Sequence, residues 1–294
     1  MGRRGRVVKL IAVGDNVSDT YLDDGVYYPG GQAVNVAVNA ALDGAEQAGY
    51  LGVFGDDARA DYIRSVLEGK GVRCDRCRRA YAPTARPGVR LVDGDRVFQR
   101  GPRDSCQHLF AMNIVSEDLE LLGGYDVCHL TNEAHLEGEL ERIHSVVPIS
   151  FDFSCDREPA YLDAVCPHID YAFISGADLM PDEARELAEG VVARGVRVAV
   201  VTRGEHGALA LEAPAARAAS EAPEVPAGAP RLHEVAACPA DLLDTMGAGD
   251  SFAAAFLVRY LDVHDVAEAL AFAAERAART CEVHGAFGCG HPCD

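Results

Sequence analysis

Residues 244–257, DTMGAGDSFAAAFL, place two carboxylates around a short glycine-rich turn that leads into an apolar run. Such a turn offers unpaired backbone N–H groups and the positive end of a helix dipole, which together bind anions such as phosphate. Gly247, Ala248 and Gly249 fit that role. A carboxylate beside bound phosphates is electrostatically unfavourable, so its presence suggests a catalytic role. Asp250 could accept the proton of a hydroxyl that attacks a phosphoryl group. The alternative makes Asp250 the N-cap of the helix, and local chemistry leaves both readings open.

Two other phosphate-binding motifs are excluded by the sequence. A P-loop requires G-x-x-x-x-G-K-[S/T], but neither Lys9 nor Lys70 is followed by Ser or Thr, and the chain has no other lysine. A dinucleotide fingerprint at the 244–257 loop requires a third glycine where Phe252 stands. Anion binding at this loop therefore depends on backbone amides.

A second polar cluster follows the first apolar run, in the stretches GDNVSDTY and PGGQAVNVAV. Its side chains supply the donors and acceptors that sugar hydroxyls need: Asp15, Asp19, Gln32, Asn35 and Asn39. Gly30 and Gly31 allow a ligand to approach the backbone closely. The alternative interpretation is a solvated helix face preceded by a capping aspartate.

Composition narrows the class of partner. The formal net charge is -19 over 294 residues, which disfavours nucleic acid and anionic membrane surfaces as partners. No stretch approaches 18 consecutive apolar residues, and the start, MGRRGRVVKLIAVGD, has no cleavage site, so we expect a cytoplasmic protein with a small-molecule substrate.

The ten cysteines are expected to be reduced thiols, with Cys74 and Cys77 the only C-x-x-C pair. Cys289, His291 and Cys293 are expected in a frayed end, with binding of a metal ion as the alternative.

Short Val- and Ile-rich runs alternate with segments of helical period, which predicts an α/β protein with a mostly parallel central sheet flanked by helices. The period predicts helices near residues 135–146, 182–194, 250–261 and 264–281.

Two stretches, about 20–30 and 88–99, break this alternation, the second around an Asp93-Gly94 turn. They are expected to form a small β-sheet lid, with ordinary edge strands as the alternative. The Ala/Pro-rich segment 212–234 is expected to be a surface insert in a single domain spanning residues 1–294.

DTMGAGDSF resembles the D-T-x-G-A-G-D signature of the ribokinase/PfkB family of carbohydrate kinases, and the early glycine pair with Asn35 resembles its G-G-x-x-x-N signature. The resemblance covers nearly the whole chain apart from 212–234. It implies a ribokinase-like fold, ATP-dependent phosphorylation of a sugar and a homodimer formed through the lid. Asp250 would be the catalytic base and the amides of Gly247, Ala248 and Gly249 the anion hole. The implied sugar-binding residues are Asp15, Asp19, Gly30, Gly31, Gln32 and Asn35.

The same resemblance implies a nucleotide site and two kinds of cation. The T-x-G-x-x-G stretch carries over as ATP contacts, a β-hairpin turn being the alternative: Thr202, Gly204, Glu205 and Gly207. Ser175 to Asp178 stand where relatives have N-x-x-E near magnesium, and Mg²⁺ is expected between the β- and γ-phosphates. Asp244 and Thr245 match positions near a monovalent cation such as K⁺. Ala278, with Ala274 and Gly285, would flank the adenine and the cation.

Several stretches, among them VGDNVSDTY, FDFS at 151–154 and the late HGAF, are most similar to the fructoselysine 6-kinase branch, which implies transfer to the 6-hydroxyl of a fructosamine. The likeness fades at residues 99–110. Four arginines could instead favour an acidic or phosphorylated head group: Arg90, Arg96, Arg100 and Arg103. A kinase for fructose, another ketose or a nucleoside, and a catalytically silent sugar-binding regulator, are the alternatives.

Overall fold

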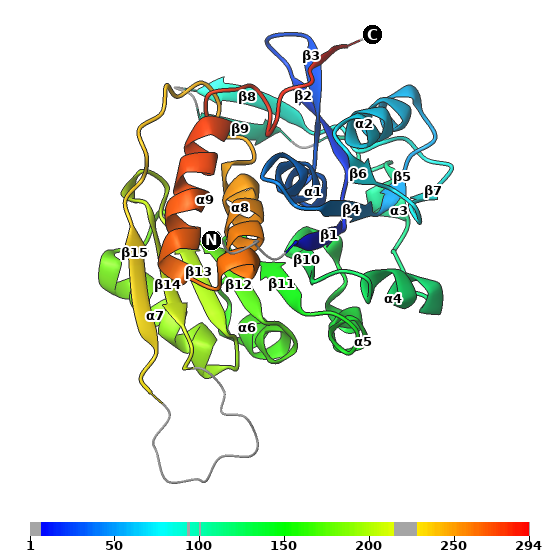
Figure 1. Ribbon diagram of the computed structural model, residues 1–294. Coiled ribbons are helices and arrows are strands. Elements are labelled where there is room, and N and C mark those ends of the chain that lie inside the picture. The colour runs from blue at the N-terminus through cyan, green and yellow to red at the C-terminus, as the bar shows by residue number, and fades with distance from the viewer. Residues whose placement is uncertain (1–6, 93–94, 100, 215–227, 294) are drawn as a thin grey trace, which may run out of the picture.

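The computed structural model describes residues 7–92, 95–99, 101–214 and 228–293 (Figure 1). Its centre is a nine-stranded sheet in the order β15-β14-β13-β12-β11-β10-β1-β4-β6. Seven strands are parallel: β1 (Lys9–Val13), β4 (Gln47–Leu51), β6 (Val72–Arg73), β10 (Val127–Thr131), β11 (Ile149–Asp152), β12 (Tyr171–Ser175) and β13 (Val198–Thr202). The antiparallel strands β14 (Ala208–Glu212) and β15 (Arg231–Val235) complete one edge. The predicted mostly parallel sheet is confirmed.

Helices cover both faces of this sheet, as its continuous apolar strands require. One face carries α1 (Gln32–Leu42), α2 (Ala58–Gly69), α8 (Ala248–Val263) and α9 (Val266–Thr280). The other carries α4 (Ser116–Leu122), α5 (Leu140–His144), α6 (Pro159–Val165) and α7 (Pro181–Ala193). The alternation along β1 divides its side chains between the two cores, with Leu10 packed under the first group of helices and Ile11 under the second.

A second, five-stranded sheet stands apart from the first, in the order β16-β3-β2-β8-β9. Its strands are β2 (Val17–Tyr21), β3 (Val26–Gly30), β8 (Gly88–Val92), β9 (Asp95–Gln99) and β16 (His291–Pro292). The two stretches expected to form a small sheet do so, and the edge-strand alternative is wrong. Residues 93–94, the predicted turn between β8 and β9, lie outside the described residues.

Three expectations from the sequence need correction. Residues 231–234 are not part of a surface insert, because they pair with β14 as strand β15, while 215–227 lie outside the described residues. His291 is not in a frayed end, since it pairs with Tyr27 of β3. The helix near 135–146 is reduced to one 3₁₀ turn, Glu137–Glu139, and the short α5, because His135 takes a left-handed conformation with φ 51° that cannot begin a right-handed helix.

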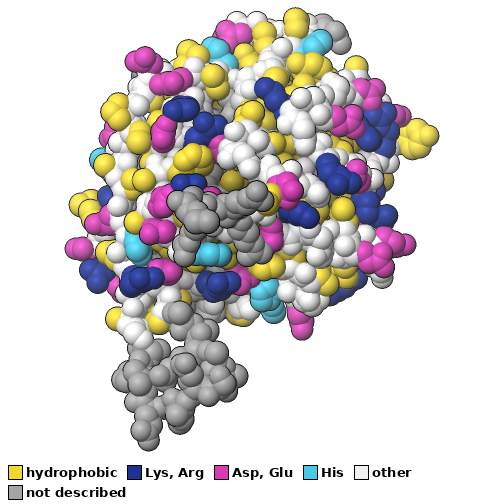
Figure 2. Space-filling model, in the orientation of Figure 1, with side chains coloured by type: hydrophobic (Ala, Val, Ile, Leu, Met, Phe, Trp, Pro, Cys, Tyr) yellow, Lys and Arg dark blue, Asp and Glu magenta, His cyan; other side chains and the backbone are white. Residues whose placement is uncertain are grey.

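Short elements complete the chain: α3 (Cys106–Leu109), and a strand pair of β5 (Val53–Phe54) with β7 (Arg78–Arg79). None of the described helices is both long and apolar enough to span a bilayer. On the face seen in Figure 2, acidic and basic side chains are interspersed, so the negative charge of the chain is not gathered into one area of that face.

Candidate active site

The site lies where the carboxyl ends of the parallel strands meet the N-termini of α1 and α8. In a parallel α/β sheet these ends form the crevice in which ligands bind. Asp15 follows β1, Asp152 ends β11, and Ser175 and Thr202 end β12 and β13. From the strand order, Ser175 and Thr202 lie on one side of Asp152 along this edge and Asp15 lies on the other.

Asp250 and Asn35 join the two helices at the centre of the site. Asn35 Nδ2 donates a hydrogen bond of 2.7 Å to Asp250 Oδ2, and both residues are buried. The N-cap of α8 is Gly247, with φ 71°, so the alternative that made Asp250 the cap is wrong. The solvated-face alternative for α1 is also wrong, because Asn35 and Asn39 are 3% and 4% exposed.

The pKa of Asp250 is raised to about 7, mainly by burial. The hydrogen bond from Asn35 and the charge of Arg96 lower it, whereas the carboxylates of Asp152 and Asp15 raise it further. A carboxyl group that titrates near neutrality is suited to general-base chemistry, since it is both ionised and basic enough to take a proton at physiological pH.

Asp15 and Asp19 lie against the backbone that opens α1. Asp15 accepts hydrogen bonds from the amides of Gln32 (3.1 Å) and Ala33 (3.2 Å), so it binds the positive end of the helix. Asp19 is 4% exposed, and burial together with the charge of Asp15 raises its pKa to about 7. These carboxylates are held in an environment that favours their neutral forms or a bound partner.

The glycines that precede α1 allow this close approach. A Cβ atom at Gly30 would lie 1.9 Å from Asp19 Oδ2, and one at Gly31 would lie 2.7 Å from Asp15 Oδ2. The predicted sugar-binding residues are therefore brought together around one helix start, with Gln32 half-buried beside them.

Gln32 leads into a chain of polar side chains that crosses the edge of the sheet, and its other members, Asn132, Asp152 and Ser154, have no role predicted above. Gln32 Nε2 donates to Ser154 Oγ (2.9 Å), and Ser154 Oγ donates to Asn132 Oδ1 (3.1 Å). Asp152 accepts a bond from the Ser154 amide (2.7 Å), and burial raises its pKa to about 6. The available signal was position, since Asn132 and Ser154 each come directly after the apolar run of a strand.

The second sheet contacts the 244–249 loop. Asp244 accepts hydrogen bonds from the hydroxyl of Tyr21, the amide of Met246 (2.9 Å) and the amide of Gly285 (2.8 Å). Arg96 Nη1 donates to the carbonyl oxygen (3.0 Å) and hydroxyl (3.1 Å) of Thr245. A monovalent cation held by Asp244 and Thr245 would have to compete with these donors, and the cation role of the two residues stays a prediction.

The predicted nucleotide residues lie at the β12–β13 side of the edge. Ser175 and Thr202 are register partners. The loop beyond Thr202 makes one 3₁₀ turn over Gly204–His206, which takes in Glu205, before Gly207 at φ 83°. A Cβ atom at Gly207 would lie 2.0 Å from the carbonyl oxygen of Val235, so this glycine lets the turn before β14 pack against the end of β15.

Ala278 lies in the last turn of α9, and the carboxylate of Asp178 pairs with Arg157 at 2.8 Å. Within the part of the chain that the structure describes, no three His, Cys, Asp or Glu residues are grouped to hold a metal ion, and this covers the Cys289–Cys293 segment. Mg²⁺ commonly binds through one or two carboxylates together with phosphates and water, and the magnesium role stays a prediction.

Three of the four arginines considered for an acidic head group are among the described residues. Arg90 lies 3.8 Å from Asp23, Arg96 contacts Thr245, and Arg103 is exposed. Arg100 lies outside the described residues.

Comparisons with known proteins identify a family and full-length relatives that this chain resembles. The profile of the pfkB family carbohydrate kinases matches residues 5–292. The chain is 40% identical over 286 residues to fructosamine kinase FrlD of Bacillus subtilis (strain 168), covering 97% of this chain and 95% of that protein. It is 33% identical over 281 residues to fructoselysine 6-kinase of Escherichia coli (strain K12), covering 95% and 99%.

Solved structures share the fold. The ribokinase of Arabidopsis thaliana, complexed with ribose and ATP, superposes with a TM-score of 0.75 at 20% identity and covers 95% of this chain and 94% of that one. The adenosine kinase of Sinorhizobium meliloti gives a TM-score of 0.73 at 18% identity, with 97% of each chain covered. At these identities the likeness concerns the fold alone.

Replacement by alanine should affect stability strongly at Gly247 and weakly at Gly249. At Gly247 the backbone has φ 71° and a Cβ atom would lie 2.2 Å from Ala286 Cβ, so Gly247→Ala should lower the free energy of unfolding by about 2–4 kcal/mol. At Gly249 no atom lies within 4 Å of the added Cβ, so Gly249→Ala should change it by less than about 1 kcal/mol. Urea denaturation of the two variants measures this, and equal losses would contradict it.

Proposed function

Since the chain belongs to the pfkB family of carbohydrate kinases, we propose that it transfers the γ-phosphate of ATP to the 6-hydroxyl of a fructosamine, with Asp250 as the general base. The observation that carries the mechanism is the buried Asp250, hydrogen-bonded to Asn35 at the junction of α1 and α8. The substrate class rests on the 40% identity to a fructosamine kinase over nearly the full length of both chains.

In the proposed reaction the 6-hydroxyl gives its proton to the ionised Asp250 carboxylate. Its oxygen then forms a bond to the γ-phosphorus, and the bond between that phosphorus and the bridging oxygen of the β-phosphate breaks, releasing ADP. Asn35 fixes the orientation of the base, because its amide donates to one carboxylate oxygen. The first-turn amides of α8, beginning after Gly247, would stabilise the charge on the transferring group.

Both substrates fit along one edge of the sheet under this proposal. The sugar would bind at the start of α1, where Asp15, Asp19 and Gln32 supply acceptors and donors. ATP would lie over the ends of β12 and β13, at Ser175 and Thr202. Bound magnesium would neutralise charge between the β- and γ-phosphates. Asp152 fits the ion better than Asp178, because Asp152 is buried at the centre of the edge whereas Asp178 is exposed and paired with Arg157.

The second sheet is proposed to be both the lid of this site and the surface of a homodimer. Exposed apolar side chains occupy both faces of the β8–β9 hairpin. Val92 and Val97 lie on one face, 57% and 48% exposed, and Phe98 lies on the other, 54% exposed. Arg96 and Tyr21 connect this sheet to the loop before Asp250, so the position of the lid and that of the base would be linked.

ADP release from MgATP tests the substrate class. The acceptors would be fructoselysine, other fructosamines, fructose, ribose and adenosine, each with and without potassium. We expect kcat/KM to be highest for a fructosamine. A higher value for fructose, ribose or adenosine would contradict the substrate and leave the kinase mechanism standing, and potassium-independent turnover would contradict a cation role for Asp244 and Thr245.

Asp250→Asn tests the base. We expect kcat to fall about 10²- to 10⁴-fold with ATP binding retained, because the amide cannot take a proton. In the wild type, kcat/KM should rise with pH through about 7, as the raised pKa of Asp250 is crossed and the carboxylate ionises. Asp241→Asn, at an exposed position, is the control. Full turnover by Asp250→Asn would refute the mechanism.

The assembly can be tested by light scattering. A dimer is expected at micromolar concentration, and Val97→Asp should convert it to a monomer, because the new charge would be buried in the interface. Tyr81→Asp, at a side chain 94% exposed outside the second sheet, should leave the mass unchanged. A monomeric wild type would contradict the proposed dimer.

A further inference from the structure

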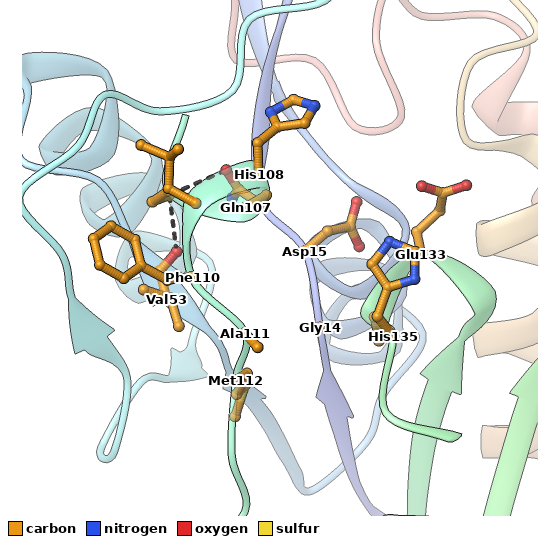
Figure 3. Close-up of a pocket in the computed structure, with 13 residues that line it drawn as sticks. Gly14, Asp15, Val53, Gln107, His108, Phe110, Ala111, Met112, Glu133 and His135 are labelled. Carbon is orange, nitrogen blue, oxygen red and sulfur yellow. Dashed lines mark hydrogen bonds between the residues drawn. The ribbon is translucent and has the colours of Figure 1, made fainter. Parts of the chain in front are cut away.

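A cavity of about 260 Å³ opens beside Asp15, away from the ends of β12 and β13. One wall is the turn after β10, which contains Glu133, and the other is α3 and the segment that follows it (Figure 3). Most of that second wall, residues 106–110, falls within the stretch 99–110, where the likeness to the fructoselysine 6-kinase branch fades. The cavity is therefore built partly from the region expected to vary with the substrate.

The cavity continues the proposed sugar site along α1. Asp15 lines the cavity and accepts hydrogen bonds from the first amides of α1, whereas Asp250 meets Asn35 further along the same helix. A sugar whose 6-hydroxyl lies at Asp250 and whose carbon chain follows α1 would direct its opposite end, C1, toward Asp15. In a fructosamine, C1 carries the amine and the amino acid.

The charges of the cavity suit an amine. The charge of Glu133 adds to burial in raising the pKa of Asp15, so the two carboxylates repel each other in the ligand-free protein. None of the described residues that line the cavity is Lys or Arg. A cation placed between Asp15 and Glu133 would relieve this repulsion.

The opposite wall suits a hydrocarbon chain. Leu109 and Phe110 line the cavity while remaining 58% and 47% exposed, and Met112 extends the same wall. Apolar side chains left exposed at the mouth of a cavity are typical of a ligand-binding groove. The polar and apolar walls together match an alkylammonium group.

We propose that this cavity binds the amino-acid part of the fructosamine, with its secondary ammonium between Asp15 and Glu133 and its carbon chain along Phe110 and Met112. The proposal rests on the proposed function. Glu133 is then a specificity residue that distinguishes a fructosamine from fructose, which lacks the amine.

Steady-state kinetics with ε-fructoselysine, fructosylglycine and fructose test the proposal. Glu133→Gln should lower the ratio of kcat/KM for a fructosamine to that for fructose about tenfold, through a higher KM. Ala111→Trp, at an exposed position on the cavity wall, should lower the same ratio by filling the space. Glu141→Gln makes the same charge change at an exposed position outside the cavity and should leave the ratio unchanged.

The outcomes separate this inference from the proposed function. A wild type that phosphorylates fructosamines while both cavity variants keep its ratio would overturn the inference alone, as would a fall in kcat at unchanged KM in Glu133→Gln. A wild type that phosphorylates none of the fructosamines would overturn both.

Discussion

The hydrogen bond between Asn35 and Asp250 joins two helices whose residues are 215 positions apart, and the rest of the site depends on it. It requires the starts of α1 and α8 to meet over the same strand ends, and it requires a carboxylate to be buried there. Asp15 lies half-buried beside the first of these helix starts, and the buried Asp19 and Asp152 lie close by. Helix dipoles, backbone amides and the guanidinium of Arg96 offset part of the cost of this burial. The rest of that cost appears as raised pKa values of Asp19 and Asp250, and Asp250 is therefore a stronger base than an exposed carboxylate.

Local sequence patterns were sufficient to predict the parallel sheet and the two glycine-containing stretches of the candidate site. The alternation of apolar runs and helical periods predicted the parallel sheet, because each strand is buried on both faces by the helices that follow it. The loop at 244–250 and the glycines before α1 predicted the two halves of the site, since anion cradles and close backbone approach need those residue types. The family resemblance then related the two halves, which spacing alone could not have done.

The parts that the sequence did not predict depend on contacts between distant segments. Ser154 meets Gln32 and Asn132 only when β10, β11 and α1 are assembled, so its position after an apolar run could not by itself identify its partners. Strand β15 was hidden by the Ala/Pro-rich composition before it, although its partner β14 supplies the register. Arg96 was one of four arginines considered for an acidic head group on charge alone, and its guanidinium contacts the backbone of Thr245. In each case the residue's place in the structure depends on the distant segment that it contacts, which its residue type does not reveal.

The second sheet takes β2 and β3 from residues 17–30 and its edge strand β16 from residues 291–292. During synthesis on the ribosome, the segment that carries Asp15, Asp19 and Asn35 emerges long before the one that carries Asp250 and β16. Until the later segment arrives, the open side of β3 has no partner and the apolar face of α1 lacks the cover of α8. The nascent chain therefore exposes an unpaired strand edge and an uncovered helix face, both of which favour association with other chains, and the candidate site is complete only after the segment with Asp250 has been synthesised.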